Sequence, residues 1–247
     1  MSQLARLFPR TAAVKSATWL AKCVCAAFSF LLLSAPAIAQ TTYSDSEFVN
    51  SDWTLFTETS NGSSAIKSQV NSGGNPDAWM RVENTSNNAI ISTYIFSNTA
   101  VYSPNTSGAI STLSVTFNHY TFQITPFSSH GQYVGLAIRQ NNKSYYGQFD
   151  QSYPSSWASI SIASMTQDTF RTLSDANDHP DFSTNGSTLS FGLWNYNVDG
   201  ATRTTGSAFD NFSVTVQNAS IVPESGTLAL LGFAVLPVGT WLVRRRK

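Results

Sequence analysis

Few side chains in this chain could carry acid–base chemistry. Residues 40–221 hold three glutamates and three histidines, namely Glu47, Glu58, Glu83, His119, His130 and His179. A glycosidase needs two carboxyl groups about 5 to 9.5 Å apart, and these glutamates do not form a closely spaced Glu-x-Asp-x-x-Glu pattern. A hydrolytic triad needs a nucleophile beside a base, but the chain has no Gly-x-Ser-x-Gly turn. The sequence therefore predicts a protein that is not an enzyme; the alternative is a secreted polysaccharide hydrolase that uses aspartates.

Metal-binding patterns are equally sparse. No two histidines have the spacing of zinc ligands. The densest set of oxygen donors is Asp-Ala-Asn-Asp-His-Pro-Asp-Phe at 175–182, and Ca²⁺ prefers about six to eight such oxygens. The segment lacks the glycine and the terminal glutamate of an EF-hand loop, so a solvated acidic loop is the simpler interpretation.

Aromatic side chains gather in the second half of the chain. They are Tyr145, Tyr146, Tyr153, Trp157, Trp194 and Tyr196. Aromatic faces beside a few polar groups form sugar-binding surfaces, because such a site combines apolar area with placed hydrogen-bonding atoms. Aromatic residues also fill the cores of β-sandwiches, and the sequence does not say which rings face outward.

Alternation of apolar and polar residues predicts the strands that position these groups. It is clearest at 113–117, 134–138, 189–193 and 212–216, where every second residue is apolar, as in a half-buried strand. Further strands are predicted at 53–57, 65–70, 79–83, 90–96, 145–149 and 157–162. Turn-forming Asn, Gly and Pro separate these windows. About ten short strands predict an all-β, antiparallel two-sheet sandwich in residues 40–221.

The two ends of this domain resemble a known family. Ser-Glu-Phe at 46–48, Asp-Trp at 52–53 and Phe-Asp-Asn-Phe-Ser-Val at 209–214 are similar to the opening and closing strands of jelly-roll carbohydrate-binding modules and related galactose-binding-like domains. The resemblance implies a jelly-roll sandwich and a glycan ligand. It also implies a structural Ca²⁺ held by Glu47 and Asp210, because the matching positions of such modules often bind one. The other interpretation is that Asp210 accepts backbone donors at the start of its strand.

Residues 1–39 have the features of a secretory signal peptide. A basic start, with Arg6, Arg10, Lys15 and Lys22, precedes an apolar run at 24–33. Ala37 and Ala39 fit the small-x-small cleavage pattern, which places Gln40 at the new N-terminus. The apolar run has about ten residues, whereas a membrane helix needs roughly 20. Cys23 and Cys25 are removed with this segment, so we expect no disulfide.

The C-terminal residues predict a membrane helix. Residues 226–243 carry no charge, and 18 helical residues at about 1.5 Å each nearly span a hydrocarbon core of about 30 Å. Four cations follow: Arg244, Arg245, Arg246 and Lys247. Such a cluster stays in the cytoplasm, which places the preceding domain outside. The alternatives are a buried C-terminal helix and a GPI-anchor signal.

The segment before this helix resembles a bacterial sorting signal. Val-Pro-Glu at 222–224, an apolar span and a basic end are similar to the PEP-CTERM signal, with Ser225 where that motif usually has its second proline. The resemblance makes 222–247 a sorting signal with Pro223 and Glu224 as its motif. It implies cleavage by an exosortase-like enzyme after transient anchoring in the inner membrane, followed by transfer to the cell surface or extracellular matrix.

Charge limits the partners of the domain. Residues 40–221 hold six Lys and Arg against thirteen Asp and Glu, a net charge of −7. Nucleic-acid binding needs clustered cations, so we expect no nucleic-acid partner. The sequence predicts a non-catalytic, exported surface or matrix protein whose partners are the processing enzyme, the inner membrane and, as a ligand, polysaccharide.

Overall fold

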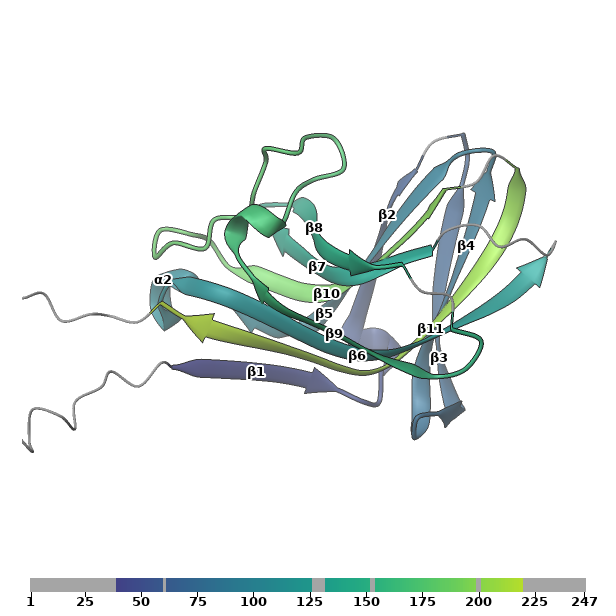
Figure 1. Ribbon diagram of the computed structural model, residues 1–247, viewed down its shortest axis with the longest axis horizontal. Coiled ribbons are helices and arrows are strands. Elements are labelled where there is room, and N and C mark those ends of the chain that lie inside the picture. The colour runs from purple at the N-terminus through teal and green to yellow at the C-terminus, as the bar shows by residue number, and fades with distance from the viewer. Residues whose placement is uncertain (1–38, 60, 126–131, 152–153, 199–200, 220–247) are drawn as a thin grey trace, which may run out of the picture. The chain divides into compact units, whose positions relative to one another are not determined.

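The computed structural model describes residues 39–219, except 60, 126–131, 152–153 and 199–200 (Figure 1). The predicted sorting signal and the signal peptide, apart from its last residue, lie outside this range. Among the described residues, no helix is both long enough and apolar enough to cross a membrane.

The described residues are mainly β-structure, with eleven strands and three short helical segments. The strands are β1 (Gln40–Asp45), β2 (Trp53–Thr59), β3 (Ser64–Gly74), β4 (Asp77–Asn87), β5 (Ile90–Tyr102), β6 (Ile110–Thr125), β7 (Gln132–Gln140), β8 (Lys143–Asp150), β9 (Ala158–Met165), β10 (Leu189–Val198) and β11 (Thr202–Asn218). The helical segments are η1 (Asn50–Asp52), α2 (Pro104–Ser107) and η2 (Gln167–Thr169). The all-β prediction is confirmed.

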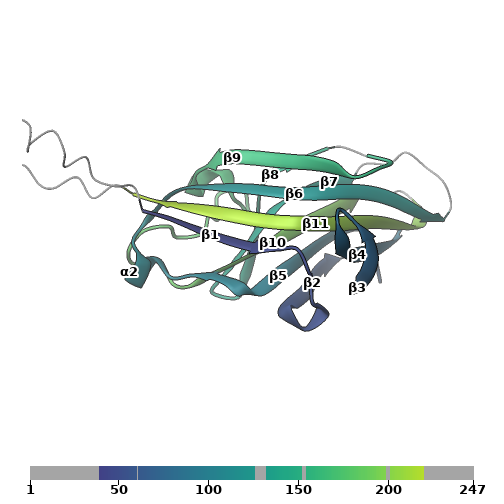
Figure 2. The same cartoon turned by 90° about the horizontal axis from the view of Figure 1, so that it is seen from below.

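The strands form two antiparallel sheets. Sheet A has the order β3-β4-β11-β6-β9, with β1 also paired to β11. Sheet B has the order β2-β5-β10-β7-β8. Figure 2 shows β9, β6, β11 and β1 of sheet A side by side, with sheet B behind them. The predicted jelly-roll sandwich is therefore the observed architecture.

β11 is the central strand of sheet A and changes partner along its length. Thr202–Phe209 pairs with β4, and the segment 212–217 pairs with β1. Between the two parts, the register with β6 shifts between Asp210 and Ser213, and Asn211 has a positive φ of 52°. Such a β-bulge bends a strand and increases its twist, so β11 can join both arms of the sheet.

Alternation along the strands builds the core between the sheets. Leu113, Val115 and Phe117 of β6 point inward, and Leu136 and Ile138 of β7 do the same from the other sheet. Each is fully buried or nearly so. A buried Leu, Ile or Phe side chain contributes about 1.5 to 3 kcal/mol, so this interface holds the sheets together.

One part of the interior is polar. Asn84 of β4 donates to Asn197 Oδ1 at 2.6 Å and to Asn195 Oδ1 at 3.2 Å, and its own Oδ1 accepts from Thr93 at 2.8 Å. Ser207 of β11 continues the network to Gln132 of β7 at 3.0 Å. Buried amides are stable only when hydrogen-bonded, so these contacts fix how the two sheets meet.

Candidate functional site

The outer face of sheet B carries a cluster of aromatic rings. Leu193 of β10 points into the core. Trp194 and Tyr196 lie on the opposite face of the same strand and form part of a second apolar cluster. The neighbouring strands add rings to the same cluster because opposite residues in paired strands share a face. We call this cluster the aromatic face; its rings are Phe56, Tyr94, Phe96, Tyr133, Tyr146, Phe149, Trp194 and Tyr196.

Trp194 is the centre of the aromatic face. Its ring stacks on Tyr146, with centroids 4.4 Å apart and planes at 12°, and on Tyr196 at 5.3 Å and 24°. The indole Nε1 donates to Ser92 Oγ at 2.7 Å, and the residue is only 2% exposed. This hydrogen bond satisfies the indole N–H and fixes the ring, so Trp194 is a rigid floor beneath the outer rings.

The rings above that floor remain open to solvent. Tyr133, Tyr146 and Tyr196 are half-buried, and Phe149 is 39% exposed. Tyr133 meets Phe149 edge to face at 5.0 Å and lies 5.8 Å from Tyr196. Rings held by their neighbours lose little conformational freedom when a ligand arrives, so this surface is preorganised for stacking.

Two glycines keep the floor of the aromatic face low. A Cβ at Gly192 would lie 2.0 Å from the carbonyl oxygen of Ile95, and one at Gly135 would lie 2.6 Å from that of Gln148. Both glycines sit at register shifts between strands. The backbone is close-packed at both positions, so neither can carry a larger side chain without a shift of its neighbours.

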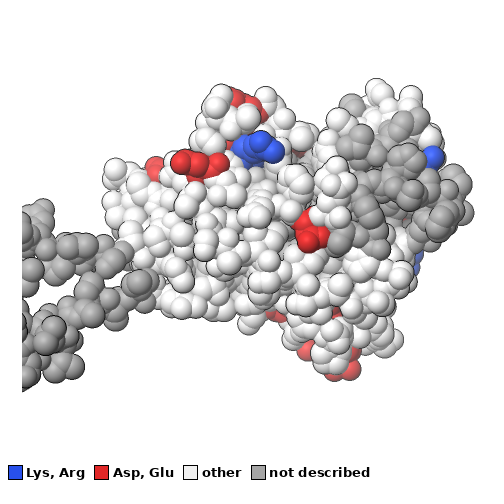
Figure 3. All heavy atoms as spheres, viewed as in Figure 1, with Lys and Arg blue, Asp and Glu red and all other residues white. Residues whose placement is uncertain are grey.

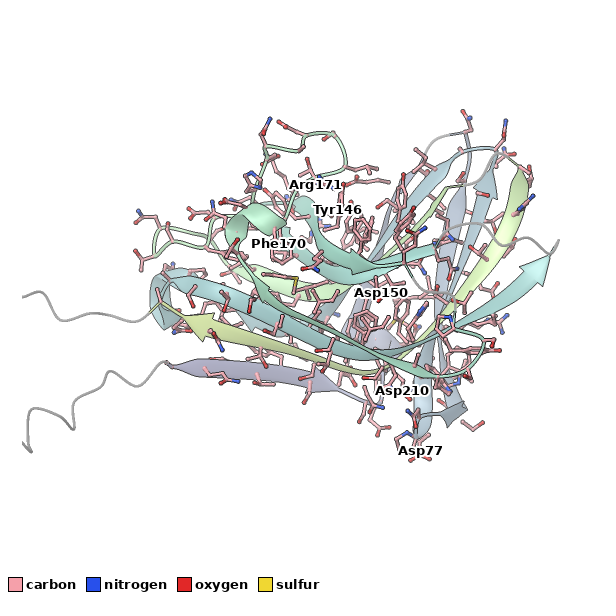
Figure 4. The ribbon with its side chains drawn as sticks, viewed as in Figure 1. Asp77, Tyr146, Asp150, Phe170, Arg171 and Asp210 are labelled. Carbon is pink, nitrogen blue, oxygen red and sulfur yellow. The ribbon has the colours of Figure 1, made fainter. Side chains whose placement is uncertain are left out.

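The loop that follows β9 forms one wall beside the aromatic face. Tyr146 and Arg171 exchange backbone hydrogen bonds of 3.0 and 3.1 Å, which add Arg171 to the edge of β8. Phe170 is fully buried, and its ring lies where a side chain on Gly147 would be. Figure 4 shows Arg171, Tyr146 and Phe170 close together.

A depression separates this loop from the ends of β2 and β5. It has a volume of about 250 Å³ and is lined by Glu58, Thr59, Ile90 and Leu173. Glu58 lies on β2, and Tyr94 Oη lies 3.5 Å from its Oε2 atom. The depression and the aromatic face together form a surface that we call the sheet B groove.

Burial changes the acid–base properties of this groove. Desolvation raises the pKa of Glu58, although the Tyr94 hydroxyl lowers it in part. Desolvation also raises the pKa of Tyr94 well above its usual value. Burial therefore disfavours the charged form of each group, and both offer hydrogen-bonding atoms beside the rings. In the view of Figure 3, acidic and basic residues are scattered over a surface made mainly of other residues.

The structure divides the aromatic residues singled out from the sequence. Tyr146, Trp194 and Tyr196 lie on the aromatic face, whereas Tyr145 is 4% exposed and belongs to the core. Trp157 lies just before β9, near Trp79, Tyr120 and Phe122, which are on strands of sheet A and form with it a separate group of rings. Tyr153 lies outside the described residues.

Sequence reasoning did not single out several members of the groove. Phe56, Tyr133, Phe149, Arg139 and Arg171 were not among the candidates. The sequence did hold a signal for Tyr133 and Arg139. In β7 they alternate, together with Ala137, with the core residues Val134, Leu136 and Ile138, so they lie on the other face of the strand. This alternation predicts which residues of one strand share a face, but it does not predict which residues of different strands are in contact.

Asp210 lies at the bulge of β11, within the strand rather than at its start. Its carboxylate accepts the backbone N–H of Asn211 at 2.7 Å and that of Asn75 in the β3–β4 turn. Burial raises its pKa, and the charges of Asp77 and Glu47 add to this rise. Figure 4 shows Asp210 and Asp77 in the same part of the domain. These are the contacts expected if Asp210 accepts hydrogen bonds from backbone donors.

Glu47, the other predicted calcium ligand, lies in the connection between β1 and η1. It is exposed, its backbone N–H donates to Asp45 Oδ1 at 2.8 Å, and its carbonyl accepts from Gln69. Across the described residues, no three His, Cys, Asp or Glu side chains come together as metal ligands would.

The carboxylates of the acidic segment 175–182 contact protein groups of the same domain. Asp178 pairs with Lys143 at 2.7 Å. Asp175 accepts the backbone N–H of Asn177, and Asp181 accepts that of Ser183. These contacts agree with the interpretation of a solvated loop.

The potential acid–base residues are scattered. Glu83 pairs with Arg81 on β4 of sheet A, Glu58 lies on sheet B, and Glu47 lies between β1 and η1. His130 lies outside the described residues, and His179 Nδ1 contacts the Phe170 carbonyl at 2.5 Å. His119 is fully buried against Phe209, and neither of its ring nitrogens has a hydrogen-bond partner among the described residues.

Comparison with known proteins identifies no family and finds solved structures of low similarity. No protein-family model matches this chain, and no curated protein matches it. The family 11 carbohydrate-binding module of a Clostridium thermocellum cellulosomal cellulase is 14% identical, with 74% of this chain and 96% of that one covered and a TM-score of 0.41. The CBM22-1 xylan-binding domain of Paenibacillus barcinonensis Xyn10C is 11% identical, with 75% and 99% covered and a TM-score of 0.36.

Proposed function

We propose that this protein binds glycan chains in the sheet B groove. The observation that carries the proposal is a set of half-buried rings: Tyr146 and Tyr196 stack on the fixed indole of Trp194, and Tyr133 lies beside Tyr196. The C–H groups on a sugar face carry partial positive charge, and an aromatic face is negative. A row of such rings therefore suits a chain of sugars.

Polar groups beside the rings would orient the sugar hydroxyls. Glu58 and Tyr94 lie at one wall. Arg171 lies at the other, where its Nε donates to Tyr146 Oη at 3.0 Å. Apolar stacking with a few placed polar atoms is the general pattern of small-molecule sites. We propose binding without catalysis, since the three glutamates lie on separate parts of the domain.

Affinity electrophoresis tests this function. The purified protein should be retarded in native gels that contain at least one polysaccharide from a panel of neutral and acidic plant and bacterial polymers. The reducing ends of that polymer should not increase on prolonged incubation. Release of reducing ends would favour the hydrolase alternative, and unchanged mobility across the whole panel would reject glycan binding.

We also propose that the protein is exported and sorted to the cell surface or extracellular matrix. The support is the sequence pattern, a signal peptide ending at Ala39 and the motif Pro223 and Glu224 before a basic-ended apolar span. With the cations in the cytoplasm, Glu224 would lie just outside the hydrocarbon, where its charge stays hydrated. An exosortase-like enzyme could reach it there.

Intact mass measurement in a host that carries such an enzyme should find a chain that begins at Gln40 and lacks Arg244 to Lys247. Replacing Glu224 with alanine should leave uncleaved protein in the inner membrane, because the motif would no longer be recognised. A wild-type chain that retains Lys247 in such a host would replace sorting with permanent anchoring.

A structural Ca²⁺ at Glu47 and Asp210 remains a proposal. Its support is that Asp210 is buried near the negative charges of Asp77 and Glu47, which a cation would offset. The ion would tie the β1–η1 connection to the bulge of β11.

If this site is real, adding Ca²⁺ at a hundredfold excess over its dissociation constant should stabilise the fold by about 2.7 kcal/mol. Chelation should then lower the melting temperature, and the variant Asp210→Asn should lose this response. Identical melting curves with EGTA and with Ca²⁺ would remove the ion from the account.

A further inference from the structure

We propose that the sheet B groove prefers glycans that carry uronate carboxylates, an inference that rests on the proposed glycan-binding function. The inference rests on two arginines that lie against rings of the aromatic face, Arg139 of β7 and Arg171 of the loop after β9. Each lies against an aromatic ring, and neither forms an ion pair with a carboxylate among the described residues.

The other Lys and Arg side chains with a described contact bind oxygen atoms of the protein. Arg81 pairs with Glu83 on β4, and Lys143 pairs with Asp178. Lys67 donates to the backbone and side-chain oxygens of Asn50 at 2.8 Å each. Arg139 and Arg171 differ because their partners are rings, which leave much of the hydrogen-bonding edge of a guanidinium unused.

Arg139 reaches across the floor of the groove. It starts on β7, two residues after Ala137, and its guanidinium carbon lies 3.6 Å from the ring centroid of Phe56 on β2 and 5.9 Å from that of Phe96 on β5. β10 lies between β7 and β5, so the side chain crosses that strand. A cation over a ring face is held by the ring quadrupole, which fixes Arg139 among the rings.

Arg171 lies at the opposite wall and is exposed. Its guanidinium carbon is 5.3 Å from the ring centroid of Tyr146, and its Nε donates to the Tyr146 hydroxyl at 3.0 Å. The backbone pairing of Arg171 with Tyr146 fixes where the side chain begins. Its two terminal nitrogens therefore border the surface on which a stacked sugar would lie.

A uronate fits these two side chains better than a neutral sugar does. Arginine binds a carboxylate through two parallel charge-assisted hydrogen bonds, which are roughly twice as strong as neutral ones. A hydroxymethyl group at the same position offers only a neutral acceptor. Burial raises the pKa of the nearby acid Glu58, which weakens its preference for the charged form that would repel an anionic ligand.

The negative charge of the whole domain does not override this local pattern. Beyond a Debye length of about 8 Å at physiological salt, exposed charges are largely screened. Asp150 is opposite the core residue Val134 in the β7–β8 pairing, so it is on the face of sheet B away from the rings. The charged side chains that border the groove are therefore Glu58 at the β2 wall and the two arginines against the rings.

Two matched oligosaccharides test the inference. The probes are β-1,4-glucan oligosaccharides and β-1,4-glucuronan oligosaccharides of the same length, which differ only in the oxidation of carbon 6. We expect the purified protein to bind the glucuronan at least tenfold more tightly in isothermal titration at physiological salt. Equal or weaker binding of the glucuronan overturns the inference, whereas binding of neither probe nor any polymer of the panel overturns the proposed function instead.

Variants locate the preference. Arg171→Gln and Arg139→Gln should each reduce glucuronan affinity about tenfold and glucan affinity by clearly less, since only the uronate loses a charge-assisted contact and a tenfold loss corresponds to one such contact. Arg171→Lys keeps the charge but loses the planar fork, so it should recover only part of the preference. Lys67→Gln removes the same charge outside the groove and should change neither affinity.

Melting curves accompany each variant because Arg139 also packs on Phe56. If Arg139→Gln is unstable, the exposed Arg171 still decides the question. A preference that Arg171→Gln leaves undiminished, or one that Lys67→Gln weakens equally, contradicts the assignment to these arginines.

Discussion

Replacing Tyr146 with alanine is expected to weaken glycan binding about 30-fold. Tyr146 is half-buried, stacks on Trp194 at 4.4 Å, lies beneath the guanidinium of Arg171 and anchors Arg171 through its hydroxyl. A central aromatic anchor typically contributes about 2 kcal/mol or more, which corresponds to about 30-fold in affinity. Titration calorimetry with the tightest ligand of the panel measures the loss.

Two controls separate binding from folding. Tyr146→Phe keeps the stacked ring and should lose only the part of the affinity that the hydroxyl and Arg171 supply. Tyr120→Ala removes a half-buried ring from strand β6 of sheet A, near Trp157 and Phe122. It should leave affinity unchanged. Equal losses in Tyr120→Ala and Tyr146→Ala would move the binding site away from the groove.

Acidification is expected to remove about 3 kcal/mol of stability through one residue, His119. Burial lowers the pKa of His119 to about 4 from its usual 6.5, against a smaller opposing effect of Asp150. The contribution is complete above the unfolded pKa of 6.5 and is lost as the pH falls through 4, because the unfolded chain then binds a proton that the folded chain resists. The estimate of about 3 kcal/mol is the difference between the unfolded and folded pKa values of His119 multiplied by about 1.36 kcal/mol per pKa unit.

The variant His119→Phe isolates this effect. Phenylalanine keeps a ring against Phe209, which lies 5.2 Å from His119, and it cannot titrate. Urea unfolding between pH 7 and pH 4 should show a markedly flatter dependence for the variant than for wild type. The raised pKa values of Glu58 and Asp210 act in the opposite direction, and they are common to both proteins. An unchanged difference in stability between pH 7 and pH 4 would show that His119 is not the group responsible.

Strand positions were predictable because alternation is a local signal. The predicted strand windows all overlap observed strands, and the sandwich follows from them. β1 was not predicted, because Gln40–Asp45 contains a single aromatic residue among polar ones. Its place depends on pairing with the segment 212–217 of β11, a long-range contact that the local pattern does not encode.

The groove was only partly predictable. Tyr145 and Tyr146 are adjacent, yet one faces the core and the other the groove, and only the register of β8 decides between them. Arg139 meets Phe56 across intervening strands, a contact that depends on strand order. The position of Asp210 at a bulge likewise depends on the change of partner along β11 rather than on its neighbours in sequence.

The most direct test of glycan binding in the sheet B groove follows the tryptophan indole resonances by NMR while an oligosaccharide is added. Trp194 lies beneath the proposed ligand, whereas Trp79 and Trp157 contact each other in the ring group of sheet A. We predict that the ¹⁵N–¹H indole signal of Trp194 shifts in a saturable way and that those of Trp79 and Trp157 do not. A saturable shift of Trp79 or Trp157 with Trp194 unchanged would contradict the account.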